Sequence, residues 1–531
     1  MKSYIHTNSM SMLEDGSRFF TGINEVIYKN IEASFFLKDI ISNSFGPEGM
    51  NKMILSEYEK IMITNNTVDI LKNINVNHPI SKLMLFFSLN QELDLGDSGG
   101  FVVIFGTELL KSSYCLLKDG FHISDIINNF IKAGKLTLKF LETLAIFRLA
   151  DITNIKVVAS LLSLTMNQTN QGLESYLAPQ IAYACIKTLL HNKKNFSNSD
   201  IRVVKILGGS YEQIKTITGS VILRDTEGTI KKTKKANIVI FSGVFDLTSP
   251  ETKSSILFKT AEDIMSCQSS ENFFIEQIVK DLINCGINVI IANGFSDISL
   301  YFIEKYNIMA LKIQSRFDLR RIARTCGAMV LGKIRKPNLE EMGKCDFVSV
   351  RSFGSQKVTI FQQETLQSKI FTIVARASST HLLDFIEKTV FRSASVFKTI
   401  VRDNRFLAGA GASEIEMLRR LKSFSYEKTS GVQQFIIQKF AEAFESIPRT
   451  LIENSGQDPF KILSFLYNEH SKGNEYEGVD IQKSTTINTR RNGIWDSFAC
   501  KYWAIKHSIE ASTTILTVDQ IIMAKKSLPD Y

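Results

Sequence analysis

Three turns carry the residues best suited to chemistry, and the first is glycine-rich. The first turn contains Phe45, Gly46, Pro47 and Gly49. It lies between a helical run at 31–44 and an apolar strand at 53–55. Because glycine has no Cβ, backbone N–H groups in such a turn can approach a ligand closely. Polarised amides at a helix terminus or in a turn are natural partners for phosphate, so this turn predicts a phosphate site.

Two further polar turns strengthen this prediction, because glycine–proline pairs alone mark ordinary turns more often than phosphate sites. One turn covers residues 63–66, and the other covers residues 95–100 and carries the acid Asp97. An apolar helical run follows each turn, so that three turns could converge on one anion. An Asp that opens a helix is also favoured as an N-cap without any other function, and this alternative stays open for Asp97.

The composition is that of a folded protein with several domains. The 531 residues are too many for one core, and about three domains are expected. No apolar run approaches the ~20 residues needed to span a bilayer, and the first residues lack the apolar core of a signal peptide. The seven cysteines are scattered without a CxxC pair, which predicts reduced, buried thiols. We expect a cytoplasmic protein without a membrane partner.

The net charge of +9 is spread over the chain. The densest basic run covers residues 231–235, where we expect a turn. A short basic run of this kind is typical of a solvated hairpin rather than of a nucleic-acid surface. We therefore expect no nucleic-acid partner.

The elements around these turns divide the chain into helical ends and an α/β middle. Helical spacing of apolar residues covers 17–44, 67–73, 81–93, 101–117, 123–147, 151–190, 380–396, 413–423, 432–470 and 498–525. From about 203 to 361, short apolar strands alternate with helices, which favours an α/β domain. Residues 244–270, with Phe245, predict a protruding excursion from this domain. A third glycine turn contains Gly409 and Gly411 and opens the helix at 413–423.

Several stretches together resemble one family, the group II chaperonins. Residues 46–53, 96–100 and 409–412 carry the turns in the order and spacing of that family. Stretches at 205–210, 305–309, 318–321, 441–449, 501–506 and 518–525 are similar to its eukaryotic cytosolic members. The resemblance covers nearly the whole chain.

The resemblance implies a multidomain α/β fold. A mostly α-helical equatorial ATP-binding domain would comprise 1–145 and 408–531, and a two-piece intermediate hinge domain would comprise 146–213 and 371–407. An α/β apical substrate-binding domain would comprise 214–370, with a lid segment at 244–270. The implied partners are seven other chaperonin subunits in a hetero-oligomeric double ring, and unfolded cytosolic clients such as actin and tubulin.

The resemblance also implies a site for ATP or ADP with Mg²⁺. Its nucleotide-binding residues would be Phe45, Gly46, Pro47, Gly49, Asp97, Ser98, Gly99, Gly100, Gly409, Gly411, Asp496 and Lys501. Asp97 would hold the metal, since a hard divalent cation takes carboxylate and phosphate oxygens. Ser98 and Gly99 stand where the family has glycine and threonine, which should weaken phosphate contact without abolishing it.

Two acids of the family's site are replaced in this chain. Asn66 and Arg392 occupy their positions, and an amide or an arginine cannot accept a proton as a base. Losing a positioned base typically costs about 10²–10⁴-fold in rate. The Arg392 charge should also favour the nucleotide-bound state, by at most a few kcal/mol at an effective dielectric constant of about 20. Alternatively, Asp384, Asp403 or Asp69 supplies the missing acid after a local rearrangement.

Three functional interpretations follow from these residues. The first is a ring subunit that binds nucleotide with impaired hydrolysis, so that no catalytic residue is assigned. The second is a fully active ATPase that tolerates the replaced acids. The third is a stand-alone substrate-binding paralogue.

Overall fold

The computed structural model describes residues 18–20, 23–55, 61–74, 76, 78–149, 151–166, 172–191, 196–246, 261–354, 356–363 and 370–523. The chain forms two compact units. Unit 1 comprises Met1–Gly172 and Phe391–Tyr531, and unit 2 comprises Leu173–Val390. The finer division into three domains stays a prediction.

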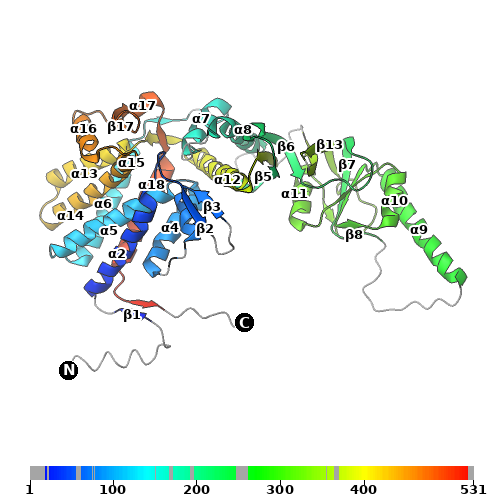
Figure 1. Cartoon of the computed structure of the whole chain (residues 1–531), viewed down its shortest axis with the longest axis horizontal. Coiled ribbons are helices and arrows are strands. Elements are labelled where there is room, and N and C mark those ends of the chain that lie inside the picture. The colour runs from blue at the N-terminus through cyan, green and yellow to red at the C-terminus, as the bar shows by residue number, and fades with distance from the viewer. Residues whose placement is uncertain are drawn as a thin grey trace, which may run out of the picture. The chain divides into compact units, whose positions relative to one another are not determined.

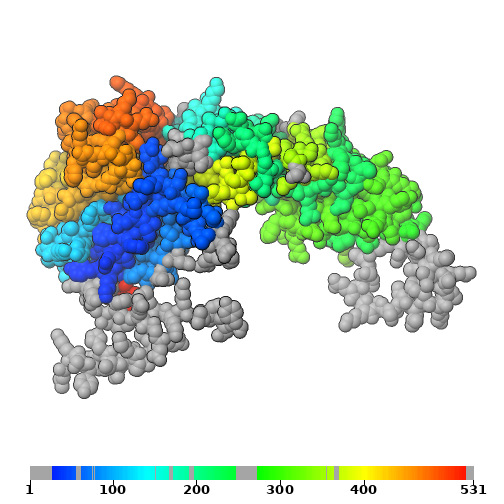
Figure 2. Space-filling model, viewed as in Figure 1, coloured from blue at the N-terminus to red at the C-terminus, as the bar shows by residue number. Residues whose placement is uncertain are grey.

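Unit 1 is mainly helical and contains both ends of the chain. Its helices are α2 (Ile23–Ser42), α3 (Thr67–Asn73), α4 (Pro79–Leu95), α5 (Gly99–Lys118), α6 (Ile123–Thr143), α7 (Ile155–Met166), α13 (Ala412–Lys428), α14 (Val432–Glu442), α15 (Ser446–Asn454), α16 (Pro459–Ser471), α17 (Thr489–Asn492) and α18 (Phe498–Leu516). Helix α12 (Thr380–Arg402) begins in unit 2 and ends in unit 1. Figure 2 shows the blue surface of the N-terminal helices beside the orange surface of the C-terminal part of this unit.

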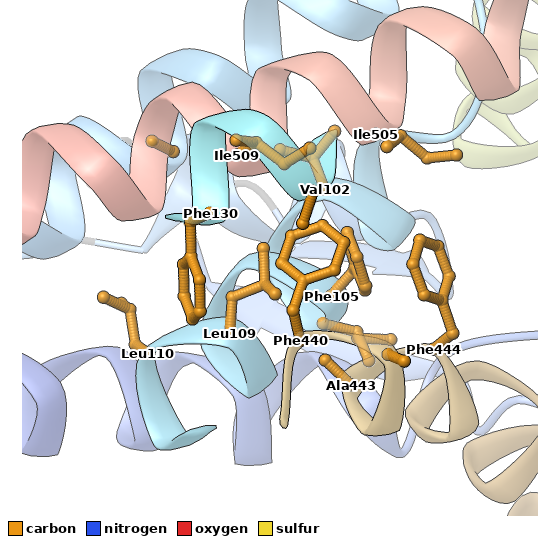
Figure 3. Packing of buried hydrophobic residues seen from close by; sticks show 14 of the residues in the cluster. Val102, Phe105, Leu109, Leu110, Phe130, Phe440, Ala443, Phe444, Ile505 and Ile509 are labelled. Carbon is orange, nitrogen blue, oxygen red and sulfur yellow. The ribbon is translucent and has the colours of Figure 1, made fainter. Parts of the chain in front are cut away.

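The core of unit 1 is built around α5. Phe105 is fully buried, and its ring lies 4.4 Å from that of Phe444, centroid to centroid. Figure 3 shows this aromatic cluster with Phe440 below α18, which contributes Ile505 and Ile509. Segments more than 300 residues apart in sequence, such as α5 and α14, therefore share one core.

Helix α5 corrects one expectation from the sequence. By length and composition, Gly99–Lys118 is long and apolar enough to cross a membrane. In the fold, 72% of its most apolar 18-residue window is buried inside the protein. The apolar character of α5 is therefore used in the core of unit 1, whose other helices cover it.

Short strands complete unit 1. The strand expected at 53–55 is confirmed as β2 (Lys52–Leu55), which pairs antiparallel with β3 (Ile61–Thr64). Strand β16 (Arg405–Ala408) pairs with β19 (Trp495–Ser497) and with β4 (Phe147–Arg148). Two further pairs are β17 (Glu477–Asp480) with β18 (Thr485–Asn488), and β1 (Arg18–Phe20) with β20 (Ile521–Met523).

Unit 2 contains a nine-stranded mixed sheet and four helices that lie wholly within it (Figure 1). Its main strand order is β11 (Met309–Lys312), β9 (Val289–Ala292), β7 (Lys232–Phe241), β13 (Gly343–Phe353), β14 (Gln356–Gln362), β6 (Lys215–Ile222), β15 (Phe371–Ala377) and β5 (Ile201–Leu207), and β12 (Val330–Leu331) pairs with β7. The helices are α8 (Glu174–His191), α9 (Ala261–Asn284), α10 (Asp297–Lys305) and α11 (Arg316–Cys326).

The alternation along β7 distributes the helices over this sheet. Successive side chains of a strand point to opposite faces. Ile238 and Ile240 belong to the cluster that includes Leu319 of α11. Val239 belongs to the cluster that includes Val279 of α9 and residues of α10. The α/β character expected for the middle of the chain is confirmed.

Some local expectations are wrong. Residues 232–235 of the basic run lie in strand β7, where we expected a turn, and Lys232, Thr233 and Lys234 pair with β13. Phe245, expected in a protruding excursion, lies in strand β8 (Val244–Phe245) and is 2% exposed, because it packs under α9. Residues 247–260 of the predicted lid lie outside the described residues. Helix α6 ends at Thr143, and Cys115 is an exposed free thiol rather than a buried one.

Candidate functional site

The first glycine turn is fixed against helix α15. Gly46 has φ +87°, and a Cβ at this position would lie 2.6 Å from Leu451 Cδ2. The side-chain amide of Asn454 donates 2.7 Å hydrogen bonds to the carbonyl oxygens of Ser42 and Phe45. Only glycine provides both the left-handed backbone and the close approach at position 46.

Gly49 closes the same turn. A Cβ at Gly49 would lie 2.4 Å from the carbonyl oxygen of Ser44, so a side chain there would displace the backbone. Pro47 has no N–H group and contributes only a carbonyl oxygen to any ligand. The amides that this turn can offer are therefore those of its other residues.

The Asp97 turn links α4 to α5. Gly96 ends α4 in the left-handed conformation. Ser98 is the N-cap of α5, at φ 69° and ψ 19°, and makes no side-chain capping hydrogen bond. Asp97 is therefore not the residue that caps α5, and the interpretation of this acid as a plain N-cap is wrong.

Three predicted turns meet around Gly100. A Cβ at Gly100 would lie 2.8 Å from Thr67 Cγ2 and 3.1 Å from Phe45 Cδ2. A Cβ at Gly99 would lie 2.6 Å from Val68 Cγ2, so the threonine of the family would collide with α3 here. The structure thus brings the turns at 45–53, 63–66 and 95–100 together.

The third glycine turn approaches the same helix, α15, as the first. Gly411 has φ +81°, and a Cβ there would lie 2.9 Å from Pro448 Cβ. Pro448 and Leu451, which contacts Gly46, are three residues apart and share one face of α15. A Cβ at Gly409 would lie 3.3 Å from Asp496 Oδ1. The chain therefore assembles this region from both of its ends.

Lys501, in the first turn of α18, neutralises two acids from other elements. Its ammonium group forms ion pairs with Glu414 and, at 2.9 Å, with Asp496. It also donates a 3.1 Å hydrogen bond to Ser413 Oγ. Burial lowers the pKa of Lys501, but the charges of Asp496 and Glu414 outweigh burial and raise this pKa well above its ordinary value. Lys501 therefore stays a cation at neutral pH.

The carboxyl group of Asp97 is held in a densely packed setting. Burial raises its pKa above the ordinary value, although the charge of Arg392 and a hydrogen bond from the Ser98 N–H oppose this rise. A bound divalent cation would stabilise the carboxylate form and lower the pKa again. A cation close to Asp97 would thus keep its buried carboxyl group ionised.

Asn66 and Arg392, the two residues expected to replace acids, both contact the carboxylate of Glu92 near the end of α4. Asn66 is the N-cap of α3, and its side-chain amide donates a 3.1 Å hydrogen bond to Glu92 Oε1. Arg392 Nε lies 3.3 Å from the same oxygen. Burial raises the pKa of Glu92, while the Arg392 charge and the Asn66 hydrogen bond oppose the rise. The acid Glu92 therefore lies between Asn66 and Arg392, the two positions where acids were expected.

Two of the three acids considered as substitutes are held elsewhere, whereas the third, Asp69, lies close enough to Glu92 for its charge to raise the pKa of Glu92. Asp403 forms a 2.7 Å ion pair with Arg405, which lowers the pKa of its carboxyl group. Asp384 forms a 2.8 Å ion pair with Lys205 in unit 2. Both carboxylates are thus engaged by neighbouring cations.

The residues present fit a nucleotide with a divalent cation. A Cβ at Gly46, Gly49 or Gly411 would lie less than 3 Å from a neighbouring atom, so the close-packed backbone of these turns depends on glycine. Asp97 offers the hard oxygen that Mg²⁺ prefers. Within the described ranges, no group of three or more His, Cys, Asp or Glu side chains could hold a metal by itself. A cation at Asp97 would therefore need phosphate oxygens as further ligands.

Sequence reasoning missed three residues of this region. Glu92, Glu414 and Asn454 lie on helices without any motif of their own. Their places follow from packing between segments far apart in sequence, as in the 409-residue separation between Asn454 and Phe45. The one signal in the sequence is the position of Glu414, which closely follows the third glycine turn and lies in the first turn of α13.

Comparisons with known proteins agree with this geometry. The TCP-1/cpn60 chaperonin family matches residues 37–526. The chain is 39% identical over 515 residues to T-complex protein 1 subunit theta of Dictyostelium discoideum, with 97% of this chain and 96% of the relative covered. Identity to the protein of the same name is 38% in Homo sapiens and 35% in Arabidopsis thaliana, each covering 97% of this chain and 94% of the relative. The chain therefore belongs to the TCP-1/cpn60 chaperonin family.

Proposed function

We propose that this chain is the theta-type subunit of a hetero-oligomeric, ATP-dependent chaperonin (CCT/TRiC) in the cytoplasm. The proposal is supported by the 35–39% identity to subunits of that name over 97% of the chain. Seven other subunits would complete each ring of a double ring. Its clients would be unfolded cytosolic proteins such as actin and tubulin.

We further propose that the site in unit 1 binds ATP or ADP with Mg²⁺. When bound, the nucleotide would supply its phosphates, and Asp97 would hold the cation. The turn at Phe45, Gly46, Pro47 and Gly49, together with Ser98, Gly99 and Gly100, would line the phosphates. Gly409, Gly411, Asp496 and Lys501 would lie on the side formed by the C-terminal segment.

Hydrolysis at this site is proposed to be impaired. The observation that carries this proposal is that Asn66 and Arg392, at the positions of the two family acids, both contact Glu92. Neither side chain can take a proton from water. The chain would therefore hold nucleotide and turn it over slowly.

Single-turnover hydrolysis of radiolabelled ATP by the full chain tests this proposal. The variant Asn66→Asp with Arg392→Asp should hydrolyse ATP about 10²–10⁴-fold faster than the unmodified chain, because it restores both acids. Adding Glu92→Gln removes the like charge that the new acids would face. Arg402→Asp, at an exposed position of the same helix, makes the same charge change as Arg392→Asp alone and should leave the rate unchanged.

Two outcomes would contradict the proposal. If the unmodified chain already hydrolyses ATP at the rate of the restored variant, the active-ATPase interpretation replaces impaired hydrolysis. If the native protein sediments as a monomer rather than at megadalton size, the ring assignment fails and the stand-alone interpretation takes its place. Loss of Mg²⁺-dependent nucleotide binding in Asp97→Asn checks the metal assignment separately.

A further inference from the structure

Glu92 lies where the end of α4 meets α3 and the last part of α12. Its side chain is 12% exposed, and that of its partner Arg392 is 19% exposed. One carboxylate oxygen accepts a 3.1 Å hydrogen bond from Asn66 Nδ2 and lies 3.3 Å from Arg392 Nε, with which it forms an ion pair. A single carboxylate thus connects three elements that the sequence separates.

The backbones touch at the same place. Gly96 has φ +84°, and a Cβ there would lie 2.6 Å from the carbonyl oxygen of Arg392 and 2.8 Å from Ser395 Cβ. The hydroxyl of Thr399 lies 3.4 Å from the carbonyl oxygen of Leu95. The ion pair therefore acts at a contact where α12 already packs directly on the turn that carries Asp97.

Arg392 is the main cation that acts on the carboxylates of Glu92 and Asp97. The site contains four acids, namely Glu92, Asp97, Glu414 and Asp496. Lys501 already pairs with two of these acids, Glu414 and Asp496. Breaking a largely buried ion pair on one side leaves the other charge uncompensated, which is strongly destabilising. Loss of Arg392 would thus remove the cation that opposes most strongly the rise in pKa of both Glu92 and Asp97.

We propose that Asn66, Glu92 and Arg392 form an internal latch that holds α12 at Arg392 against the Asp97 turn both with and without bound nucleotide. Glu92 is then a positioning residue, and not a substitute base. Asn66 and Arg392 stand at the positions where the resemblance implies two acids facing the nucleotide. The contact with Glu92 therefore permanently occupies that place. Its meaning for nucleotide retention rests on the proposed function, whereas its existence without nucleotide does not.

Hydrogen–deuterium exchange of the nucleotide-free full chain tests the latch. The readout is the exchange rate of amides in peptides covering 91–99 and 391–402. Glu92→Gln and Arg392→Gln should each speed this exchange on the order of 100-fold, because each removes one charge of a largely buried ion pair. Arg402→Gln, at an exposed position of the same helix, should leave the exchange unchanged.

A double-mutant cycle separates pairing from general damage. The double variant Glu92→Gln with Arg392→Gln should exchange no faster than either single variant, because a neutral pair replaces the ion pair. Additive effects of the two single variants would overturn the latch. The cycle uses neutral, nearly isosteric side chains, and circular dichroism of each variant checks that the chain remains folded.

Nucleotide measurements decide the role of Glu92. In the latch, Glu92→Gln should speed the release of a fluorescent ADP analogue by about tenfold or more, in line with typical coupling free energies. If Glu92→Gln instead abolishes residual ATP hydrolysis and leaves exchange unchanged, Glu92 is a base and the latch is wrong. Failure of the unmodified chain to bind nucleotide would overturn the proposed function, while the exchange cycle would still decide the latch.

Discussion

Ser98 shows how a single replacement changes the candidate site. This residue adopts φ 69°, in the left-handed region, although it is not glycine. An L-residue in that conformation loses roughly 1–2 kcal/mol relative to the right-handed one. The strain lies directly beside Asp97, so the serine both distorts the turn and adds a hydroxyl group to it.

Replacing Ser98 with glycine should relieve this strain. We expect Ser98→Gly to stabilise the chain by up to about 1 kcal/mol, since glycine also gains freedom in the unfolded state. It should also tighten nucleotide binding, because the turn regains the residue of the family. Thermal unfolding and titration with a fluorescent nucleotide measure the two effects.

Ser484→Gly is the matched control. Ser484 has φ 54° and is exposed in the turn between β17 and β18. Its replacement should give a similar gain in stability without any change in nucleotide affinity. Equal changes in affinity for both variants would show that the Ser98 conformation has no bearing on the site.

Glu416 provides a pH-dependent prediction at the residue scale. Burial raises the pKa of this carboxyl group, but hydrogen bonds from His470, Arg419 and Arg420 outweigh burial and bring the pKa to about 2. The unfolded value is 4.5, so the stability that Glu416 contributes is present above pH 4.5 and is lost as the pH falls toward 2. The loss should reach up to about 3 kcal/mol.

Urea unfolding at a series of pH values measures this contribution. Glu416→Gln should lower stability at pH 7 and flatten its decline between pH 4.5 and 2, the range set by the two pKa values. Glu469→Gln is the control, because Glu469 also has a lowered pKa but is solvent-accessible. A decline in Glu416→Gln as steep as in the unmodified chain would assign the acid sensitivity to other carboxyl groups.

At the scale of elements, helix α15 braces two glycine turns from opposite ends of the sequence. Leu451 contacts Gly46, and Pro448 contacts Gly411. Asn454 adds hydrogen bonds to the carbonyl oxygens at the end of α2 and in the first turn. The relative positions of the two turns therefore depend on one short helix that carries no phosphate-binding motif.

Gly411→Ala tests this arrangement. A Cβ at Gly411 would lie 2.9 Å from Pro448 Cβ, so α15 and the turn must move apart. We expect a loss of about 2–3 kcal/mol in stability, from backbone strain and from overpacking together. Nucleotide affinity should fall as well, which a fluorescent nucleotide titration measures.

Gly473→Ala is the control for backbone strain alone. Gly473 has φ +92°, and a Cβ there would meet nothing within 4 Å. Its replacement should cost about 1–2 kcal/mol and leave nucleotide affinity unchanged. If both variants bind nucleotide as tightly as the unmodified chain, the spacing between α15 and the third turn does not matter for binding.

At the scale of the whole molecule, unit 2 is a continuous segment with its own hydrophobic clusters. Leu173–Val390 contains the nine-stranded sheet and the helices on both of its faces. We expect this fragment to fold alone, with a stability of roughly 5–15 kcal/mol typical of native domains. A cooperative thermal transition followed by circular dichroism would show this.

The complementary deletion supplies the control. A chain in which a short glycine–serine linker replaces residues 173–390 should retain the buried Phe105 cluster, because that cluster lies wholly in unit 1. A fragment of unit 2 that unfolds without cooperativity, beside a cooperative unit 1, would show that unit 2 depends on the rest of the chain.

The sequence predicts the elements better than it predicts their contacts. Helical periodicity identifies α3, α4 and α5, because local spacing determines them. Residues 232–235 were expected in a turn, since charged side chains on the exposed face of β7 hide the alternation of a strand. Glu92 could not be assigned, because its role follows from the packing of α3 and α12 on α4 and from no motif in its neighbourhood.

The order of synthesis gives the central helix of unit 1 a long exposure. Gly99–Lys118 leaves the ribosome well before Phe440, Phe444 and α18, which cover it in the finished protein. For this interval, an apolar surface awaits partners from the far end of the polypeptide, and such surfaces aggregate readily. A nascent chain therefore exposes Gly99–Lys118 until Phe440, Phe444 and α18 have been made, and the core of unit 1 can close only after that.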